Sequence, residues 1–477
     1  MSIPEQMNRM PETNTLTLEW IAAIRSSEDG GRSLAEVQAI MDRSTAICHG
    51  QPVPCSAVPR LFSTTEKFRM QYACETMHRI LKKIIERYCA DPAFRTLFPF
   101  DPRAENLIID SWDKRTSLPF ARYDVFLDER TGGFTFCELN ADGSSGMNED
   151  REIARALRTT AAFEQLSQTH RLEPNELIES WIDTFIDLAD LATSSAPLVA
   201  ICDYRENATL AEFEVYRKHF KNRGIACEIC DVRSLMVKDD ALRLPNGRRI
   251  DAVWRRCVSS DLLAHWDESQ ALIRAMCTGL ACVLGDFSGA IAHDKRIFSV
   301  LHSPRAQEII TEGERAFVAQ HVPYTTPLDG NHIDAARLKD EKDLWVIKPA
   351  DGYGAKDVHL GIDCIDEHWS ALVDAHIGNA CGRPFVAQRF HAPYRSLAAP
   401  LSENAEKTTA DFKPYANLSG LYAYDGHFAG TYSRLGPGNI VSGLFGGLSA
   451  ATFWIDCARP DPRMQASPSS VGREMRS

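Results

Sequence analysis

The chain has 477 residues, of which 44% are apolar and 25% charged, and its formal net charge is -12 with a pI near 5.7. This length suits two or three domains with a large core. The acidic balance argues against nucleic acid as the main partner, because phosphate backbones attract a basic surface. The beginning, MSIPEQMNRMPETNT, lacks the pattern of a signal peptide, and no run of about 18 apolar residues follows.

These properties predict a cytoplasmic protein with small-molecule partners and with no nucleic-acid or membrane partner. The oligomeric state stays open, with a homodimer among the options. The 14 cysteines are scattered through apolar segments, which is typical of buried, reduced thiols. Cys227 and Cys230 form a CxxC, but no second pair or histidine cluster completes a zinc set, so a zinc or redox protein is the weaker interpretation.

The N-terminal part, residues 1–100, is predicted to be a helical region that begins with about a dozen loose, polar residues. Residues 64–89 carry apolar side chains at helical spacing, which predicts one long helix with a buried face. The residues of that face are Ala73, Met77, Ile80, Leu81, Ile84 and Tyr88.

Residues 101–196 contain a predicted hairpin, RYDVFL and FTFCELN joined by the turn DERTGG, followed by helices near 149–165 and 175–192. Side chains alternate between the faces of a strand, so Arg122 and Asp124 share a face, as do Glu138 and Asn140. If the two faces coincide, two carboxylates and an amide oxygen converge, a set of ligands that suits Mg²⁺. An ordinary half-exposed hairpin is the alternative.

Residues 197–285 have the texture of a separate Rossmann-like module. PLVAI predicts a buried strand, Thr209 and Glu212 in TLAE predict a capping box, and the following helix is expected to end at Gly224. The next strands are predicted at ACEI and RRIDAVWRR, which completes a βαβ unit without any GxGxxG dinucleotide motif. Arg255 and Arg256 fit an anionic substrate or a joint between domains equally well.

Residues 286–457 hold further candidate nucleotide-binding residues, and residues 458–477 are predicted to be a disordered tail. Each candidate is weak alone, since a surface lysine or a surface loop explains it as well. Lys348 leaves an apolar strand next to a glycine-containing loop that could lie over phosphates. The whole set is Lys295 before an apolar helical segment, Lys348, Gly352 and Gly354 in DGYGAKD, Gln388 at a strand end, and Arg434 before the loop LGPGNIVSGLFGG.

In this order the motifs RYD, ELNAD, the lysine before an apolar helix, VIKP and YSR resemble the glutathionylspermidine synthetase family over residues 100–455. The resemblance implies the α/β (α+β) class and a circularly permuted ATP-grasp fold with an inserted Rossmann-like pre-ATP-grasp module and a helical N-terminal region. It also implies ATP and Mg²⁺, with the metal on Asp124, Glu138 and Asn140. Arg122 would contact the transferred phosphoryl group or the developing acyl phosphate, and Arg434 would close over the phosphates.

The resemblance further implies that Lys295, Lys348, Gly352 and Gly354 hold the nucleotide and that Gln388 lies at its adenine. The expected activity is ATP-dependent amide formation from a carboxylate and an amine through an acyl phosphate. The chain departs from the family's pattern at residues 351–354 and 143–146, which leaves the identity of acid and amine open. A nucleotide-binding scaffold or sensor without turnover and an acid kinase are the alternatives.

Overall fold

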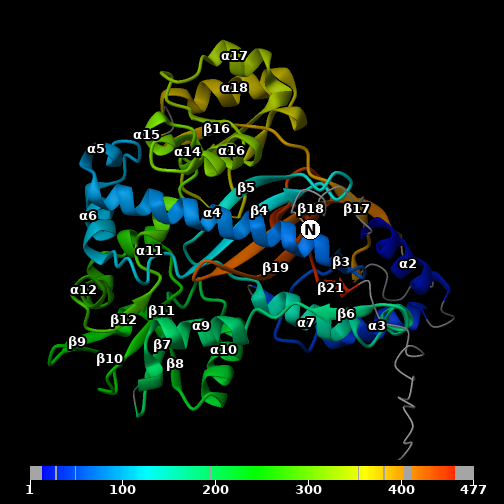
Figure 1. Cartoon of the computed structure of the whole chain (residues 1–477), viewed down its shortest axis with the longest axis horizontal. Helices are drawn as coiled ribbons and strands as arrows, with labels where there is room; N and C mark the ends of the chain where they lie inside the picture. The colour runs from blue at the N-terminus through cyan, green and yellow to red at the C-terminus, as the bar shows by residue number, and fades with distance from the viewer. Residues whose placement is uncertain are drawn as a thin grey trace, which may run out of the picture.

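The computed structural model describes residues 13–26, 30–48, 50–193, 195–352, 354–379, 382–401 and 411–456. The expected disordered tail, residues 458–477, and the loose first dozen residues lie outside this part of the chain. The described residues form several sheets with helices packed against them (Figure 1), a mixed α/β architecture. No described helix has the length and apolar character needed to cross a membrane.

A central antiparallel sheet, in the order β20-β19-β18-β4-β5, carries the predicted hairpin. The hairpin is confirmed as β4 (Phe120–Leu127) and β5 (Phe134–Asn140), with Arg122 opposite Asn140 and Asp124 opposite Glu138. Far along the chain lie β18 (Lys413–Tyr424), β19 (His427–Gly436), β20 (Leu448–Ala450) and β17 (Arg395–Ala398), which pairs with β18. Segments almost 300 residues apart therefore form neighbouring strands.

One long helix covers one face of this sheet (Figure 1). It is α4 (Thr64–Ala90), which confirms the helix expected at 64–89, and all six side chains of its predicted face are buried. Its face packs with Tyr123, Val125 and Leu421 from the sheet. Because strand side chains alternate, Arg122 and Asp124 lie on the opposite face.

A parallel sheet in the order β12-β11-β7-β8 forms a unit at the lower left of Figure 1. The expected βαβ unit is confirmed there. Its elements are β7 (Leu198–Asp203), α10 (Leu210–Asn222), β8 (Ala226–Asp231), β11 (Ala252–Arg255), α11 (Ser259–Ala264), α12 (Gln270–Thr278), β12 (Cys282–Leu284) and the hairpin β9 (Met236–Lys238) and β10 (Ala241–Arg243).

The capping box predicted at the start of α10 is wrong. Thr209 occupies the N-cap position, but its side chain caps no backbone N–H. The Glu212 carboxylate instead accepts hydrogen bonds of 3.2 Å from the backbone N–H groups of Gly146 and Asn148. Glu212 thus joins α10 to the start of α7 (Met147–Leu157), a tertiary contact that outweighs the local motif.

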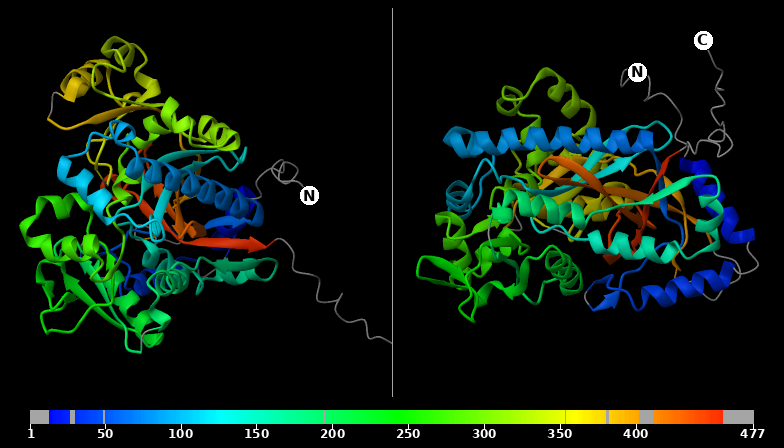
Figure 2. Two further views of the ribbon diagram at one scale, coloured as in Figure 1. Left: turned by 60° about the vertical axis from the view of Figure 1, so that its left-hand side comes forward. Right: turned by 60° about the horizontal axis from the view of Figure 1, so that its bottom comes forward.

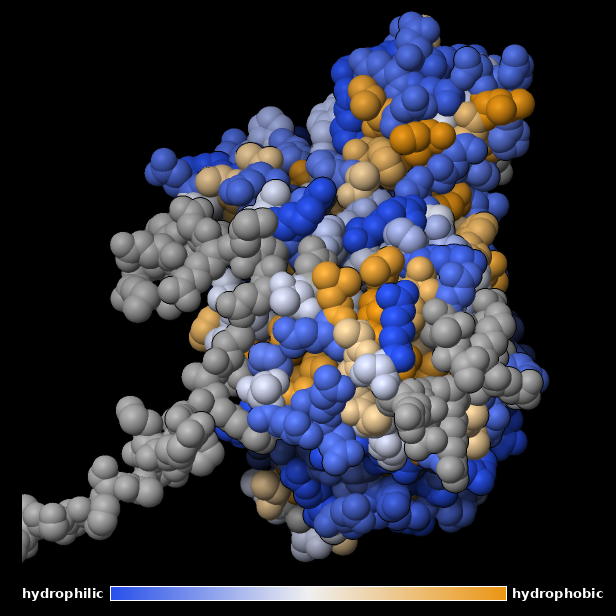
Figure 3. All heavy atoms as spheres, turned by 90° about the vertical axis from the view of Figure 1, so that its right-hand side faces the viewer, coloured by the Kyte–Doolittle hydropathy of each residue, from blue (hydrophilic) through white to orange (hydrophobic). Residues whose placement is uncertain are grey.

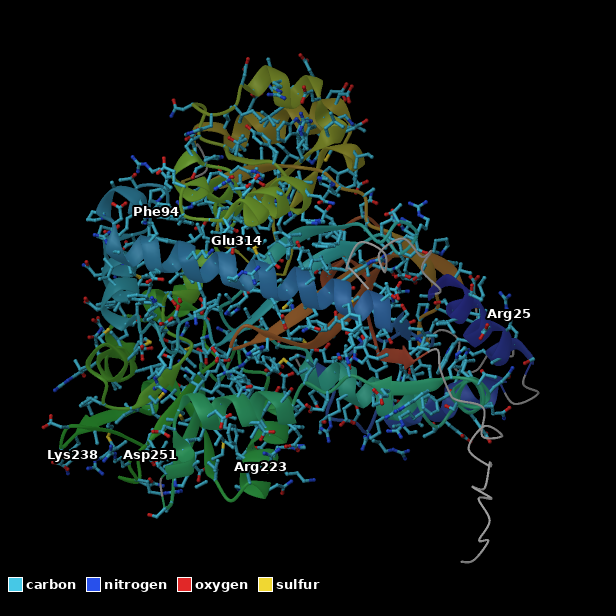
Figure 4. The ribbon with its side chains drawn as sticks, viewed as in Figure 1. Arg25, Phe94, Arg223, Lys238, Asp251 and Glu314 are labelled. Carbon is cyan, nitrogen blue, oxygen red and sulfur yellow. The ribbon has the colours of Figure 1, made fainter. Side chains whose placement is uncertain are left out.

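A third unit lies at the top of Figure 1, around an antiparallel sheet in the order β13-β16-β14-β15. It comprises β13 (Thr325–Pro327), β14 (Trp345–Pro349), β15 (His359–Leu360), β16 (Phe385–Arg389), α17 (Ala335–Asp340) and α18 (Asp366–His376), with α13 (Gly289–His293), α14 (Ile297–Leu301), α15 (Pro304–Gln307) and α16 (Glu312–His321) leading into it. Glu314 of α16 lies beside α4 (Figure 4) and pairs with Arg79 at 3.0 Å and Lys83 at 2.6 Å.

A small sheet in the order β3-β21-β6 brings distant segments together. It is made of β3 (Arg60–Ser63), β6 (Arg171–Pro174) and β21 (Thr452–Asp456), the last strand of the described chain. Beside it lie α2 (Thr13–Ser26) and α3 (Gly30–Met41). Figure 2 shows that the parallel-sheet unit and the β13-β16-β14-β15 unit both lie next to the central sheet. Figure 3 faces the right-hand side of Figure 1 and shows apolar side chains grouped in the middle of that face.

The remaining elements connect these units. The helix expected at 149–165 is in fact two helices, α7 and α8 (Ala161–Ser167). The first ends at Leu157 with Arg158 as its C-cap, and Thr160 caps the start of the second. The helix expected at 175–192 is the shorter α9 (Glu179–Leu188). The others are α5 (Pro92–Arg95), α6 (Pro102–Ser111), β1 (Ile47–Cys48) and β2 (Gln51–Pro52).

Candidate active site

A cavity of about 570 Å³ opens where the three units meet. Nine of the ten residues singled out in the sequence line it, and they come from distant segments of the chain. The lining set is Arg122, Glu138, Asn140, Lys295, Lys348, Gly352, Gly354, Gln388 and Arg434. Asp124 does not reach the cavity and lies completely buried behind these side chains.

Asp124 is the centre of a polar cluster on the central sheet. Arg122 Nε donates to its Oδ1 at 2.9 Å, and Asn140 Nδ2 donates to its Oδ2 at 3.0 Å. Arg434 reaches the same Oδ2 from β19, two strands away. Burial lowers the pKa of Arg122, but the charges and hydrogen bonds of Asp124 and Tyr422 together outweigh burial and raise that pKa overall, so the guanidinium stays charged.

Gly420 makes this cluster possible, and no sequence pattern pointed to it. It stands opposite Asp124 on β18, between the strands that carry Asp124 and Arg434. A Cβ atom on Gly420 would lie 2.7 Å from Cδ of Arg122 and 2.8 Å from Oδ1 of Asp124. The bare backbone therefore leaves the room in which both arginines meet one carboxylate.

Glu138 and Lys295 form an ion pair at the mouth of the cavity, with 3.0 Å between Nζ and Oε1. Lys295 also donates to the carbonyl oxygen of Gly352 at 2.7 Å, which ties it to the glycine-containing loop after β14. Burial alone would raise the pKa of Glu138, but the charges of Lys295, His293 and Lys348 outweigh burial and lower it to about 2. Glu138 is therefore ionised at neutral pH.

Lys348 and Gln388 lie side by side on the paired strands β14 and β16. Lys348 Nζ donates to Gln388 Oε1 at 2.7 Å and to the Cys137 carbonyl oxygen at 3.2 Å. Gln388 Nε2 donates in turn to Thr325 Oγ1 at 3.0 Å. Neutral acceptors thus hold the lysine in the cavity, and no described carboxylate forms a direct ion pair with it, although its charge still acts on Glu138.

Apolar side chains line the part of the cavity next to Lys348. Most come from strands, and apolar lining side chains of this kind suit an aromatic base. They are Phe126, Phe136, Val346, Leu360, Phe390 and Leu418.

Two glycine-rich loops border the cavity and touch each other. Gly354, with a φ of +70°, lies in the first loop, and its carbonyl oxygen accepts a hydrogen bond of 3.1 Å from Ser442 Oγ in the second. The described residues of both loops, Gly352 to Lys356 and Asn439 to Leu444, contribute to the lining except Gly443. Tyr353 lies outside the described residues.

Magnesium is the metal that the donor chemistry fits. Glu138 and Asn140 supply oxygens at the cavity, and Asp124 adds a second carboxylate directly behind them. In the described chain no three His, Cys, Asp or Glu side chains are grouped to hold a metal ion. Mg²⁺ is commonly bound by one or two carboxylates together with substrate phosphates.

Arg255 and Arg256 separate into two roles. Arg255 is buried outside the cavity lining and pairs with Asp142 at 2.7 Å, which fastens the parallel-sheet unit to the segment after β5. Burial raises the pKa of Asp142, but the charges of Arg255 and His293 and the hydrogen bonds from Ser259 together outweigh burial and lower that pKa overall. Arg256 lines the cavity, and it donates to the Ser144 carbonyl oxygen.

Sequence reasoning missed His293, Asp203, Asp261 and Thr209 as lining residues of this cavity. His293 stands two positions before Lys295, so the predicted role of the lysine could have drawn attention to His293 as a second lining residue. Asp203 and Thr209 flank the loop between a predicted strand and a predicted helix, the usual place of a ligand in an α/β unit. Only their place at the carboxyl end of a predicted strand could have indicated Asp203 and Thr209 as lining residues.

A scan against models of protein families finds no match, and a search of curated proteins finds none either. Among solved structures, the chain is similar to a glutathione synthetase-like effector from Globodera pallida, with 11% identity, a TM-score of 0.54, and 89% of this chain and 96% of that chain covered. A proposed gamma-glutamylcysteine synthetase from Methylobacillus flagellatus has 12% identity and a TM-score of 0.41, covering 82% and 90%, which is too distant to carry an argument. The first similarity shows that the chain has a glutathione synthetase-like fold.

Proposed function

We propose that the chain is an ATP-dependent carboxylate–amine ligase with a circularly permuted ATP-grasp arrangement. One observation carries this proposal: two lysines, two arginines and the Glu138 carboxylate, from four distant segments, line a single cavity, and Asp124 lies directly behind its wall. Phosphoryl transfer needs such charge neutralisation and positioning, and little covalent help from the protein. The glutathione synthetase-like fold supports the proposal, because the effector from Globodera pallida is described as glutathione synthetase-like.

The permuted order follows from where the groups lie in the chain. Asp124, Glu138 and Asn140 precede Lys295 and Lys348, whereas ordinary ATP-grasp enzymes have the lysines first. In this proposal, residues 197–285 are the inserted Rossmann-like module and residues 286–457 the nucleotide-binding segment. The partners are a small carboxylic acid and an amine.

Each side chain has a task in the first step. Lys295 and Lys348 hold the phosphates, the apolar side chains and Gln388 take the adenine, and Glu138 and Asn140 would hold Mg²⁺. Asp124, expected from the sequence to be a third ligand, lies behind the cavity wall and instead holds Asn140, Arg122 and Arg434 in place. When bound, Mg²⁺ neutralises charge on the phosphate oxygens. A carboxylate oxygen of the acid forms a bond to the γ-phosphorus, the bond from that phosphorus to the bridging oxygen breaks, and ADP leaves. Arg122 and Arg434 stabilise the charge on the transferred group.

In the second step the amine nitrogen forms a bond to the acyl carbon, and the carbon–oxygen bond to phosphate breaks. Phosphate leaves with that electron pair, and the amine gives up its proton. Water would hydrolyse the acyl phosphate, so the cavity must close. The loops at 351–357 and 435–447, which touch through Ser442 and Gly354, are placed to do so.

The test is a screen of carboxylic acids and amino acids with Mg-ATP and hydroxylamine, which traps any acyl phosphate as a hydroxamate. We expect one acid class to support both ADP release and hydroxamate formation. Replacing Lys348 or Arg122 by alanine should lower that rate about a hundredfold or more. The surface variant Lys339→Ala, which loses only its pair with Asp374, serves as the control.

The alternatives give different results in the same assay. A scaffold or sensor binds ATP but releases no ADP with any acid. An acid kinase forms hydroxamate, yet ADP release stays the same when amines are added and no condensed product is found by mass spectrometry. Normal ADP release by both Lys348→Ala and Arg122→Ala would refute the assigned site.

A further inference from the structure

The cavity has a second part at the edge of the parallel-sheet unit, lined by Asp203, Asn207, Thr209, Arg256 and Asp261, and here called the β7–β11 arm. From β7 the chain runs outward to β8 and then returns to β11 on the other side of β7. The direction of the strand order thus reverses between β7 and β11. Open α/β sheets bind ligands outside the carboxyl ends of strands at such a point.

One end of the arm is built for an anion. Helix α10 has 13 residues, and Ala208 and Thr209 at its beginning line the cavity. Because Glu212 turns away to α7, no side chain caps the N–H groups of the first turn. Thr209 Oγ1 is buried and has no hydrogen-bond partner in the described part of the chain. Free N–H groups and the positive end of the helix dipole attract a carboxylate.

Arg256 adds a charged side chain to this anion site. It is only 4% exposed and lies 4.9 Å from the ring centre of Trp254. One amino group binds the Ser144 carbonyl oxygen, and the nearest Glu212 oxygen is 3.7 Å away. Its buried Nε has no partner among the described residues. A buried donor without an acceptor is costly, so a ligand oxygen is expected beside it.

The other end of the arm is built for a cation. Asp203 is 9% exposed, and its Oδ1 accepts a hydrogen bond of 2.8 Å from the Tyr204 N–H. Asp261 Oδ2 accepts one of 2.9 Å from Asn207. Neither carboxylate forms an ion pair with any described lysine, arginine or histidine. Burial, helped by the charge of Asp261 and opposed by Arg256, raises the pKa of Asp203 to about 6.

We propose that the β7–β11 arm binds the amine substrate as a zwitterionic amino acid, with its carboxylate at the α10 N-terminus, Thr209 and Arg256 and its ammonium group between Asp203 and Asp261. This inference rests on the proposed ligase function. A carboxylate clamped by α10 is kept away from the phosphates, so the amino group is the one left to react. The turn at 143–146 connects the arm to the phosphoryl site, because Ser144 and Ser145 accept hydrogen bonds from Arg256 and Arg122 respectively.

The arm also gives the departing proton a destination. Before the nitrogen can attack, one ammonium proton passes to the Asp203 carboxylate and frees the lone pair. The lone pair then bonds to the acyl carbon, phosphate leaves with the electron pair of its carbon–oxygen bond, and a second N–H proton goes to the departing phosphate. The raised pKa of Asp203 makes it a better proton acceptor than an ordinary aspartate. Asp203 therefore positions the amine and takes up its proton.

The test is calorimetric titration of the full chain with each of the twenty standard amino acids, without ATP. The best binder is then compared with its α-amide and its decarboxylated amine. We expect saturable binding of at least one amino acid and at least tenfold weaker binding of both derivatives. Asp203→Asn should weaken binding at least tenfold, and Thr209→Val should reduce the preference for the free carboxylate.

Asp231→Asn is the matched control, because Asp231 stands opposite Asp203 on the neighbouring strand β8 and does not line the cavity. It should bind as the unmodified chain does. Absence of binding by all amino acids, equal binding of acid and amide, or unchanged binding by Asp203→Asn overturns the inference. The hydroxamate assay uses hydroxylamine and needs no amino acid as the amine. If hydroxamate formation fails while an amino acid still binds, only the proposed ligase function is refuted. If hydroxamate forms while no amino acid binds, only the inference about the amino acid is refuted.

Discussion

Single residues decide whether the two arginines can reach one carboxylate. Gly420→Ala places a methyl group within 2.8 Å of both Arg122 and Asp124, so the cluster must open. We expect a loss of about a hundredfold or more in acid-dependent ADP release, because misplaced charges no longer meet the transferred phosphoryl group. Steady-state ADP release and a circular dichroism spectrum, which should keep its native form, measure the effect.

Gly313→Ala is the control for this substitution, since nothing lies within 4 Å of its added Cβ. That variant should turn over at the normal rate. Full activity of Gly420→Ala would show that the Arg122–Asp124–Arg434 cluster does not contribute to catalysis.

Ion pairs between helices join some of the elements, and the contact of α16 with α4 is a clear case. Burial raises the pKa of Glu314, but Lys83, the Thr311 N–H and Arg79 outweigh it and lower that pKa from 4.5 to about 2. The stability from this charge is therefore complete above about pH 5 and is lost as the pH falls toward 2. We expect Glu314→Gln to lower the free energy of unfolding by about 1 kcal/mol at pH 7, and this deficit should shrink on acidification.

Urea unfolding at several pH values between 7 and 3 measures this difference. Glu312→Gln, an exposed change in the same first turn, is the control and should show little deficit. A deficit of Glu314→Gln that is the same at every pH would mean that shape, and not charge, accounts for it.

The molecule as a whole depends on how the parallel-sheet unit is fastened to the central sheet. The Arg255–Asp142 pair is buried, with side-chain exposures of 1% and 3%. Removing one partner leaves a buried charge unpaired, so Arg255→Gln should lower the free energy of unfolding by about 3–5 kcal/mol. Urea denaturation followed by tryptophan fluorescence checks this, with the exposed Arg249→Gln as the control. A change below about 1 kcal/mol would show that the joint is held by other contacts.

Local patterns in the sequence were enough for several elements. The 3.6-residue spacing from Ala73 to Tyr88 predicted α4, and strand alternation predicted that Arg122, Asp124, Glu138 and Asn140 share one region of the hairpin. These predictions succeed because spacing along one helix or hairpin sets geometry within a few residues. The candidate site residues that sequence patterns suggested also gather at one cavity, except that Asp124 lies just behind its wall.

The remaining features depend on contacts between distant segments, which local patterns do not encode. Glu212 fits a capping box, yet it binds backbone groups of α7 because the folded chain brings them within reach. Gly420 is an ordinary glycine until β18 lies beside β4, and Arg434 meets Asp124 across 310 residues of sequence. Local propensities therefore determined the elements and their polar faces, whereas tertiary packing decided which charges pair and where the substrate arm opens.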